Sequence, residues 1–161
     1  FNVTKPVVDG MVERGWGRVI NVSSVNGQKG AFGQTNYSAA KAGMHGFSKA
    51  LALEAAKYGI TVNNVAPGYV DTYMLRDAPA RIREKILDKS PVRRFGLPEE
   101  VAHAVMYLVD DKAAWSTGAT VTINGGAITL ASGDDGGSRR QQRTDAAVRI
   151  WCPVLHLYRR Q

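Results

Sequence analysis

The fold is decided by residues 24–41, whose sequence is SVNGQKGAFGQTNYSAAK. The β-branched run Val19-Ile20-Asn21-Val22 before it is typical of a buried strand. Asn36 is a helix-capping residue type, and the Ala-rich sequence from Tyr37 predicts a helix that continues to about Tyr58. The sequence therefore predicts a strand, a loop and a long helix in this order.

Three polar side chains of this stretch are candidates for shared chemistry. Tyr37 and Lys41 are four residues apart, so both project from one face of the expected helix. Ser24 stands at the carboxyl end of the expected strand, and the loop can bring it back against them. A serine, a tyrosine and a lysine that converge at a strand end form a plausible proton-transfer site.

A second strand is expected at residues 60–66, between Gly59 and the Pro67-Gly68 turn. Strand, helix and strand in this order form a βαβ unit, which predicts parallel strands and a right-handed crossover. Ligands of open parallel sheets bind beyond the carboxyl ends of the strands, where Ser24 and Pro67-Gly68 both stand.

The other elements are predicted from the spacing of apolar residues and from the Gly and Pro residues that begin or end helices and strands. A helix is expected over residues 1–13, a short helix over 80–88 within an otherwise irregular segment 69–97, a helix from Pro98, and a third strand over 120–123. The polar 69–97 segment suits a lid over a pocket or a plain surface connection. The long helix is expected to bury one apolar stripe: Ala40, Met44, Phe47 and Leu51.

Composition is that of a soluble globular protein, with 44% hydrophobic and 22% charged residues among 161. No apolar run approaches the roughly 20 residues that cross a bilayer. The single cysteine, Cys152, excludes an internal disulfide, and with only three histidines it argues against a metal site. We expect a cytoplasmic protein that binds neither membranes nor nucleic acid, since the net charge of +7 is dispersed.

The chain divides by composition at about residue 130. Residues 131–161 are rich in Arg, Gly and Gln without apolar periodicity, so we expect a disordered tail there, atypical of an evolved domain. Residues 1–130 form the candidate catalytic part. The first residues read like the middle of a helix, so we expect the chain to be a fragment.

The chemistry of the three groups follows from their types. A tyrosine hydroxyl titrates at about 10, so it is a poor base at neutral pH unless a nearby ammonium stabilises the phenolate. A serine hydroxyl can hold a carbonyl oxygen beside it. Together they can protonate a ketone oxygen while a cofactor such as a nicotinamide delivers a hydride.

Several motifs together resemble the short-chain dehydrogenases/reductases. They are Asn21-Val22-Ser23-Ser24, Tyr37-Ser38-Ala39-Ala40-Lys41, residues 63–68 (NNVAPG), residues 94–100 (RFGLPEE), Thr117-Gly118 and Asn124-Gly125-Gly126. The resemblance covers essentially all of residues 1–130. It implies a partial Rossmann-type, doubly wound parallel sheet, of which the last three strands and their flanking helices are present.

The resemblance also implies roles for single residues. Tyr37 would be the catalytic acid, Ser24 would hold the substrate carbonyl, and Lys41 would stabilise the phenolate and bind the nicotinamide ribose. The cofactor would also contact Tyr37, Pro67, Gly68, Tyr69, Val70 and Thr72. The substrate would contact Ser24, Phe32, Gly33, Gln34, Gly68 and Tyr69.

Within the family, residues 1–5, 15–18 and 25–30 most closely resemble acetoacetyl-CoA reductases of polyhydroxybutyrate synthesis. This implies NADPH-dependent reduction of an acyl-CoA substrate, with 3-oxoacyl-acyl carrier protein reductases as the alternative. Ala31 stands where those reductases have a substrate-contacting glutamine, a departure from their pattern.

The family carries its glycine-rich pyrophosphate turn, and the residues that select NADP over NAD, ahead of the motifs found here. We therefore expect little or no activity from this chain alone. Family members are tetramers or dimers, so another expectation is a fragment that only associates through its helices.

Overall fold

The computed structural model describes residues 1–128, which lie in the first of two units of the chain, residues 1–130 and 131–161. The expected disorder of the tail and Cys152 fall outside the described residues. Within them, no helix is long and apolar enough to cross a membrane.

Three parallel strands form the sheet, in the order β1 (Gly17–Val22), β2 (Ile60–Pro67) and β3 (Thr120–Ile123). Val19 lies opposite Val62, and Val65 lies opposite Val121. Seven of the eight residues of β2 are buried, as a central strand of a sheet covered on both faces requires. The predicted α/β class and all three strands are confirmed.

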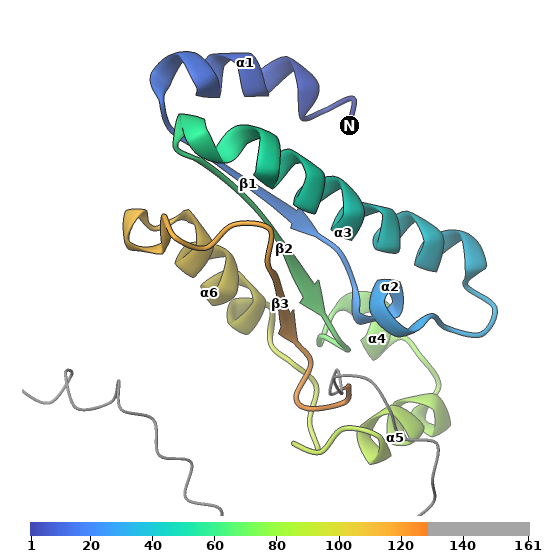
Figure 1. Cartoon of the computed structure of the whole chain (residues 1–161). Coiled ribbons are helices and arrows are strands. Elements are labelled where there is room, and N and C mark those ends of the chain that lie inside the picture. Colours follow the sequence, from blue (N-terminus) through green and yellow to red (C-terminus); the bar gives the residue numbers. More distant parts are fainter. Residues whose placement is uncertain (129–161) are drawn as a thin grey trace, which may run out of the picture. The chain divides into compact units, whose positions relative to one another are not determined.

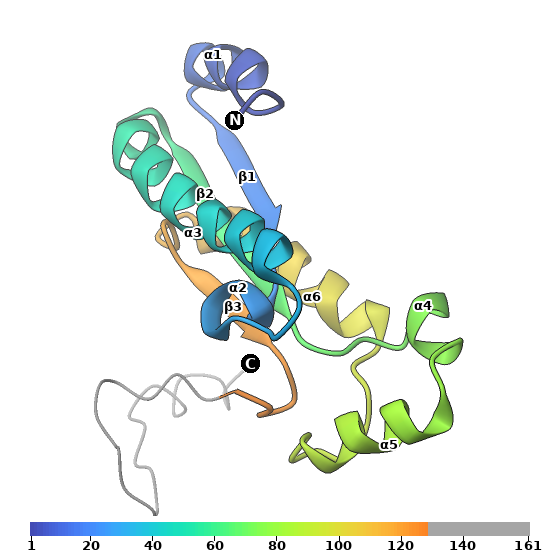
Figure 2. The ribbon, with the colours of Figure 1, turned by 90° about the vertical axis from the view of Figure 1, so that its right-hand side faces the viewer.

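Helices cover both faces of this sheet (Figures 1 and 2). Ile60 and Val62 pack with α3 (Thr35–Ala55), whereas Val65 faces the other way and packs with α6 (Pro98–Val109). Successive residues of a strand point to opposite faces, so β2 contributes to both apolar clusters. Short 3₁₀ turns follow the two helices: η1 (Ala56–Tyr58) and η2 (Asp111–Ala113).

The first helix, α1 (Lys5–Arg14), is shorter and more exposed than the sequence predicts. It begins at Lys5 rather than Phe1, and none of its residues is buried. Met11 and Val12 still pack, half-buried, against the apolar cluster of α3 and β2. Gly15 ends the helix in the left-handed conformation (φ 64°) that glycine adopts without strain.

The long helix α3 corrects three expectations. Asn36 is not its cap, because the helix begins one residue earlier, at Thr35. The α-helix ends at Ala55, and the last turn to Tyr58 is 3₁₀. The expected apolar stripe is also displaced: Ala40 is exposed, and the fully buried positions are Ser48, Ala52 and Ala55. Ser48 faces the sheet because it hydrogen-bonds to polar side chains there, which apolar periodicity cannot reveal.

Two short helices were not predicted. Helix α2 (Val25–Lys29) replaces part of the expected loop between β1 and α3. Helix α4 (Tyr73–Arg76) precedes the predicted α5 (Ala80–Asp88). We call residues 69–97 the α4–α5 segment. Its ends are joined by backbone hydrogen bonds from Gly96 N to Tyr69 O (2.9 Å) and from Asp71 N to Gly96 O (2.8 Å), and it lies beyond the carboxyl ends of the strands (Figure 1).

Candidate active site

The carboxyl end of β1 leads directly into Ser24, which is buried and caps helix α2. The Oγ atom of Ser24 accepts a hydrogen bond from Asn26 N at 3.1 Å. Because this bond occupies a lone pair, the Ser24 hydroxyl keeps its own hydrogen for another acceptor. The local fold thus leaves Ser24 able to donate.

A close approach places α2 against the first turns of α3. A Cβ atom on Gly27 would lie 2.8 Å from the carbonyl carbon of Lys41, so only glycine fits there. This packing brings the end of β1 next to the turn of α3 that carries Tyr37 and Lys41.

Tyr37 and Lys41 lie one turn apart on α3, as predicted. The Lys41 ammonium donates to the carbonyl oxygen of Val22 at 2.8 Å, and it lies 5.6 Å from the centre of the Tyr37 ring. Tyr37 itself is 43% exposed, so its hydroxyl can meet a ligand. The bond to Val22 fixes the position of the lysine charge relative to both the tyrosine and the end of β1.

The end of β2 forms the facing wall. Gly68 N donates to Ile123 O at 2.8 Å, and a Cβ on Gly68 would lie 3.0 Å from Cα of Asn124. A glycine therefore allows the chain to leave β2 close to the turn after β3. Residues 69–72 continue from there into the α4–α5 segment.

An open hollow of about 550 Å³ joins these elements. Its size falls within the range of small-molecule sites. Most of the lining comes from residues that the sequence analysis singled out for cofactor or substrate contact: Gln34, Tyr37, Gly68, Tyr69, Val70 and Thr72. Residues from α3 and from the end of β2, more than 30 positions apart in the chain, thus meet around one space.

The remaining predicted residues do not line this hollow. Ser24, Lys41 and Pro67 adjoin it, since each is bonded to, in contact with or next in sequence to a lining residue. Phe32 is fully exposed and Gly33 lies in the loop before α3, so the structure does not bring either to the hollow.

Sequence reasoning missed three lining residues: Asn26, Met74 and Leu75. Asn26 donates from Nδ2 to Oε1 of Gln34 at 2.9 Å, so it holds a predicted substrate contact in place. Asn26 lies within residues 25–30, which carry part of the family resemblance. The orientation of its side chain depends on helix α2, which the sequence analysis did not predict. Met74 and Leu75 belong to α4, for which no sequence signal was found.

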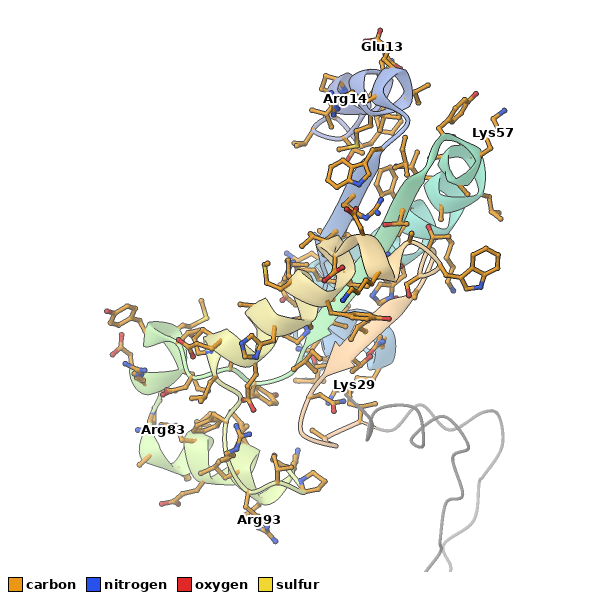
Figure 3. The ribbon with its side chains drawn as sticks, turned by 90° about the vertical axis from the view of Figure 1, so that its left-hand side faces the viewer. Glu13, Arg14, Lys29, Lys57, Arg83 and Arg93 are labelled. Atoms are coloured by element: carbon orange, nitrogen blue, oxygen red, sulfur yellow. The ribbon has the colours of Figure 1, made fainter. Side chains whose placement is uncertain are left out.

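Arg94 and Glu100 form a hydrogen-bonded ion pair near the end of the α4–α5 segment. Glu100 accepts hydrogen bonds from Arg94, at 2.7 Å for the Nη1 atom, and from Leu97 N, also at 2.7 Å. The Arg94 bonds first, and then the Leu97 backbone bond, lower the pKa of Glu100 to about 2. Arg94 and Glu100 also line a small cavity of about 90 Å³ beside Tyr69 and Gly125. This ion pair ties the end of the segment to α6. Figure 3 shows Arg93 of the same segment extending outward, whereas the Arg83 guanidinium lies 5.9 Å from the centre of the Phe95 ring.

A family model described as enoyl-(acyl carrier protein) reductase matches residues 1–128. The chain belongs to the short-chain dehydrogenase/reductase family. The order of motifs in the sequence and the parallel three-stranded sheet agree with this membership.

Curated relatives of this family are similar over most of the chain. An acetoacetyl-CoA reductase of Cupriavidus necator is 56% identical over 126 residues, which are 78% of this chain and 51% of the relative. An acetoacetyl-CoA reductase of Rhizobium meliloti is 54% identical over 127 residues, 78% of this chain and 53% of the relative. The 3-oxoacyl-[acyl-carrier-protein] reductase FabG of Pseudomonas aeruginosa is 51% identical over 126 residues, with coverages of 78% and 51%. The chain therefore spans about half the length of these reductases.

Proposed function

We propose that residues 1–128 form the catalytic half of an NADPH-dependent acetoacetyl-CoA reductase that serves polyhydroxybutyrate synthesis. The observation that carries this proposal is the hollow in which Tyr37 faces the Gly68–Thr72 wall. The names of the Cupriavidus and Rhizobium relatives support the substrate.

The site residues act as follows in this proposal. Ser24 donates its free hydrogen to the ketone oxygen of the substrate, and Tyr37 transfers a proton to that oxygen as it becomes an alcohol. Lys41 stabilises the tyrosine oxygen by its charge and, with Nζ at the carboxyl edge of β1, can also hold a ribose hydroxyl. The product is 3-hydroxybutyryl-CoA.

The cofactor's nicotinamide fits the β2 side of the hollow. When bound, it supplies the hydride for the ketone carbon. Pro67, Gly68, Tyr69, Val70 and Thr72 would hold it, since the last four line the hollow together with Tyr37 and Pro67 precedes them in the chain. Recognition of the phosphates would come from the segment that the family carries ahead of β1.

The substrate would enter between α2 and α4. Gln34, held by Asn26, offers an amide to the acyl chain from one side, and Tyr69 lies on the other.

A 3-oxoacyl-acyl carrier protein reductase is the second candidate, which the Pseudomonas relative supports. Both substrates present the same ketone and pantetheine arm to the hollow. They differ in what is attached beyond that arm.

The test uses a fusion of this chain behind the N-terminal half of the Cupriavidus reductase, called the fusion below. We expect it to oxidise NADPH with acetoacetyl-CoA at a higher kcat/KM than with acetoacetyl-acyl carrier protein. The intact Cupriavidus reductase, which shares the added half, is the matched control. The opposite preference would favour the second candidate. NADPH binding without oxidation on either substrate would contradict a reductase.

The chain by itself is expected to oxidise no NADPH. If it also binds no NADPH but forms dimers or tetramers in size-exclusion chromatography, this result supports a role in which the chain only associates with other copies. Exposed apolar side chains such as Leu53 and Trp115 offer surface for such contacts.

A further inference from the structure

The inward face of α3 carries three polar residues, Lys41, His45 and Ser48, at spacings of four and three. Each is hydrogen-bonded to one of the last residues of β1 or the residue after it. Lys41 Nζ donates to Val22 O (2.8 Å), His45 Nε2 lies 2.9 Å from Ser23 Oγ, and Ser48 Oγ lies 2.8 Å from Asn21 Nδ2. We call these contacts the α3–β1 seam.

Proton counting assigns a direction to the His45 contact. Ser23 is buried, and its hydroxyl donates its only hydrogen to Val65 O at 3.1 Å, an oxygen that can only accept. With the Ser23 hydrogen on the bond to Val65 O, the His45 contact needs a hydrogen on Nε2, so we assign the donor role to His45. Burial, followed by the charge of Lys49, lowers the pKa of His45, which favours the neutral ring.

The next contact along the seam is also directional. Asn21 Nδ2 donates to Ser48 Oγ, Ser48 Oγ donates to Asn64 Oδ1 at 2.8 Å, and Asn64 Nδ2 donates to Thr120 Oγ1 at 3.2 Å. This chain of bonds anchors the middle of α3 to all three strands. The His45 bond lies between this anchor and the turn that carries Lys41.

We propose that His45 is a positioning residue, whose Nε2–H bond to Ser23 sets the distance between the reactive turn of α3 and the end of β1. The proposal rests on the proposed function only for its kinetic consequence. Ser23 lies between Val22, whose carbonyl oxygen accepts the hydrogen bond from Lys41, and Ser24. The His45–Ser23 bond therefore controls the positions of both Lys41 and Ser24 relative to Tyr37. Without it, the first turns of α3 can shift while Ser48 still anchors the helix.

The kinetic test compares His45→Leu with His45→Gln in the fusion. Glutamine can offer an Nε2 donor where the histidine has one, whereas leucine fills the space without a donor. We expect His45→Leu to lower kcat by about 10- to 100-fold, as a misplaced reactive group does, while the substrate KM stays nearly unchanged. The pH–rate profile should move to higher pH, because the displaced Lys41 charge stabilises the tyrosine oxygen less. His45→Gln should keep most of the rate and the original profile.

Two further variants separate positioning from general structure. Ser23→Ala removes the acceptor and should reproduce the His45→Leu profile, and the double variant should be no worse than either single one. His103→Leu replaces an exposed histidine of α6 and should change neither kcat nor the profile. Equal losses in His45→Leu and His45→Gln, or an unchanged pH profile in both, would overturn the proposal.

A readout without activity tests the seam directly. Nitrogen-15 NMR of the 161-residue chain, and of the fusion, should show the His45 ring hydrogen on Nε2 and lose that signature in Ser23→Ala. A hydrogen on Nδ1 would refute the assignment whatever the activity. An inactive wild-type fusion that still shows the Nε2–H signature would contradict the proposed function but not the hydrogen bond from His45 to Ser23.

Discussion

Two regions adjoin the hollow and are built in opposite ways: β2 with α3, called the rigid wall, and the α4–α5 segment, called the outer wall. The rigid wall rests on a strand with seven of its eight residues buried, whereas α5, which continues the outer wall beyond the hollow, has no buried residue. Polar groups in the first wall are joined through buried bonds such as Ser48 to Asn64. Those in the second are joined by exposed ion pairs such as Arg76 with Asp71, at 2.9 Å.

This difference indicates a division of work. The proposed proton transfer needs groups fixed to within fractions of an ångström, which a wall with buried, hydrogen-bonded anchors such as Ser48 supplies. Ligands of varied shape need a wall that adjusts at little cost in free energy, which a segment held mainly at its two ends supplies. The following variants test this contrast.

The largest expected effect is on the rigid wall. In the fusion, Tyr37→Phe removes the proposed proton donor and should lower kcat by about 10²- to 10⁴-fold. Met74→Ala, on the other wall, should act mainly on the substrate KM. Steady-state kinetics measures both. A near-normal rate in Tyr37→Phe would remove the tyrosine from the mechanism and the contrast with it.

Apolar truncation should be costly only near the sheet. Leu108 is buried against Val65, and Leu108→Ala should lower the free energy of unfolding by about 2–5 kcal/mol. Ile82 of α5 is 40% exposed, and Ile82→Ala should cost less than about 1 kcal/mol. Urea denaturation of the fusion compares the two. Similar losses would mean that α5 is packed as firmly as the core.

Removal of a polar side chain should likewise lower the free energy of unfolding more at the rigid wall than in the α4–α5 segment. Ser48→Ala leaves Asn21 and Asn64 without their partner and should cost about 1–3 kcal/mol. Ser38→Ala is the control on the same helix, because the buried Ser38 Oγ has no partner among the described residues, and it should be neutral or stabilising. Arg76→Ala breaks an exposed pair and should cause no measurable change in the urea midpoint. A larger loss in Arg76→Ala than in Ser48→Ala would reverse the comparison.

The last and most narrowly pH-dependent effect concerns Glu100 of α6, which is bonded to the end of the α4–α5 segment. Its pKa is lowered from 4.5 to about 2 in the folded chain, so its stabilisation is present above pH 4.5 and is lost as the pH falls toward 2. Glu100→Gln should therefore reduce stability at pH 6 more than at pH 3. Urea midpoints at the two pH values measure this. Glu99→Gln, which removes a carboxylate without an ion pair within residues 1–128, should not show the difference.

Prediction from the sequence succeeded where one residue pattern determines one structure. The β-branched runs gave all three strands because such runs fit a buried sheet, and the four-residue spacing placed Tyr37 and Lys41 on one face. It failed at α2, where Ser24 caps a helix too short for a periodic signal, and at Ser48, where a polar residue occupies a core position.

The sequence by itself therefore determined the α/β class, the order of the strands along the chain and which residue types could share a proton. Only the tertiary structure decided which of them meet. Gln34, Tyr37 and Thr72 line one hollow, while Phe32 stays in solvent. It also decided that His45 and Ser48 face the sheet, because a hydrogen bond between distant segments depends on their packing, which local patterns do not encode.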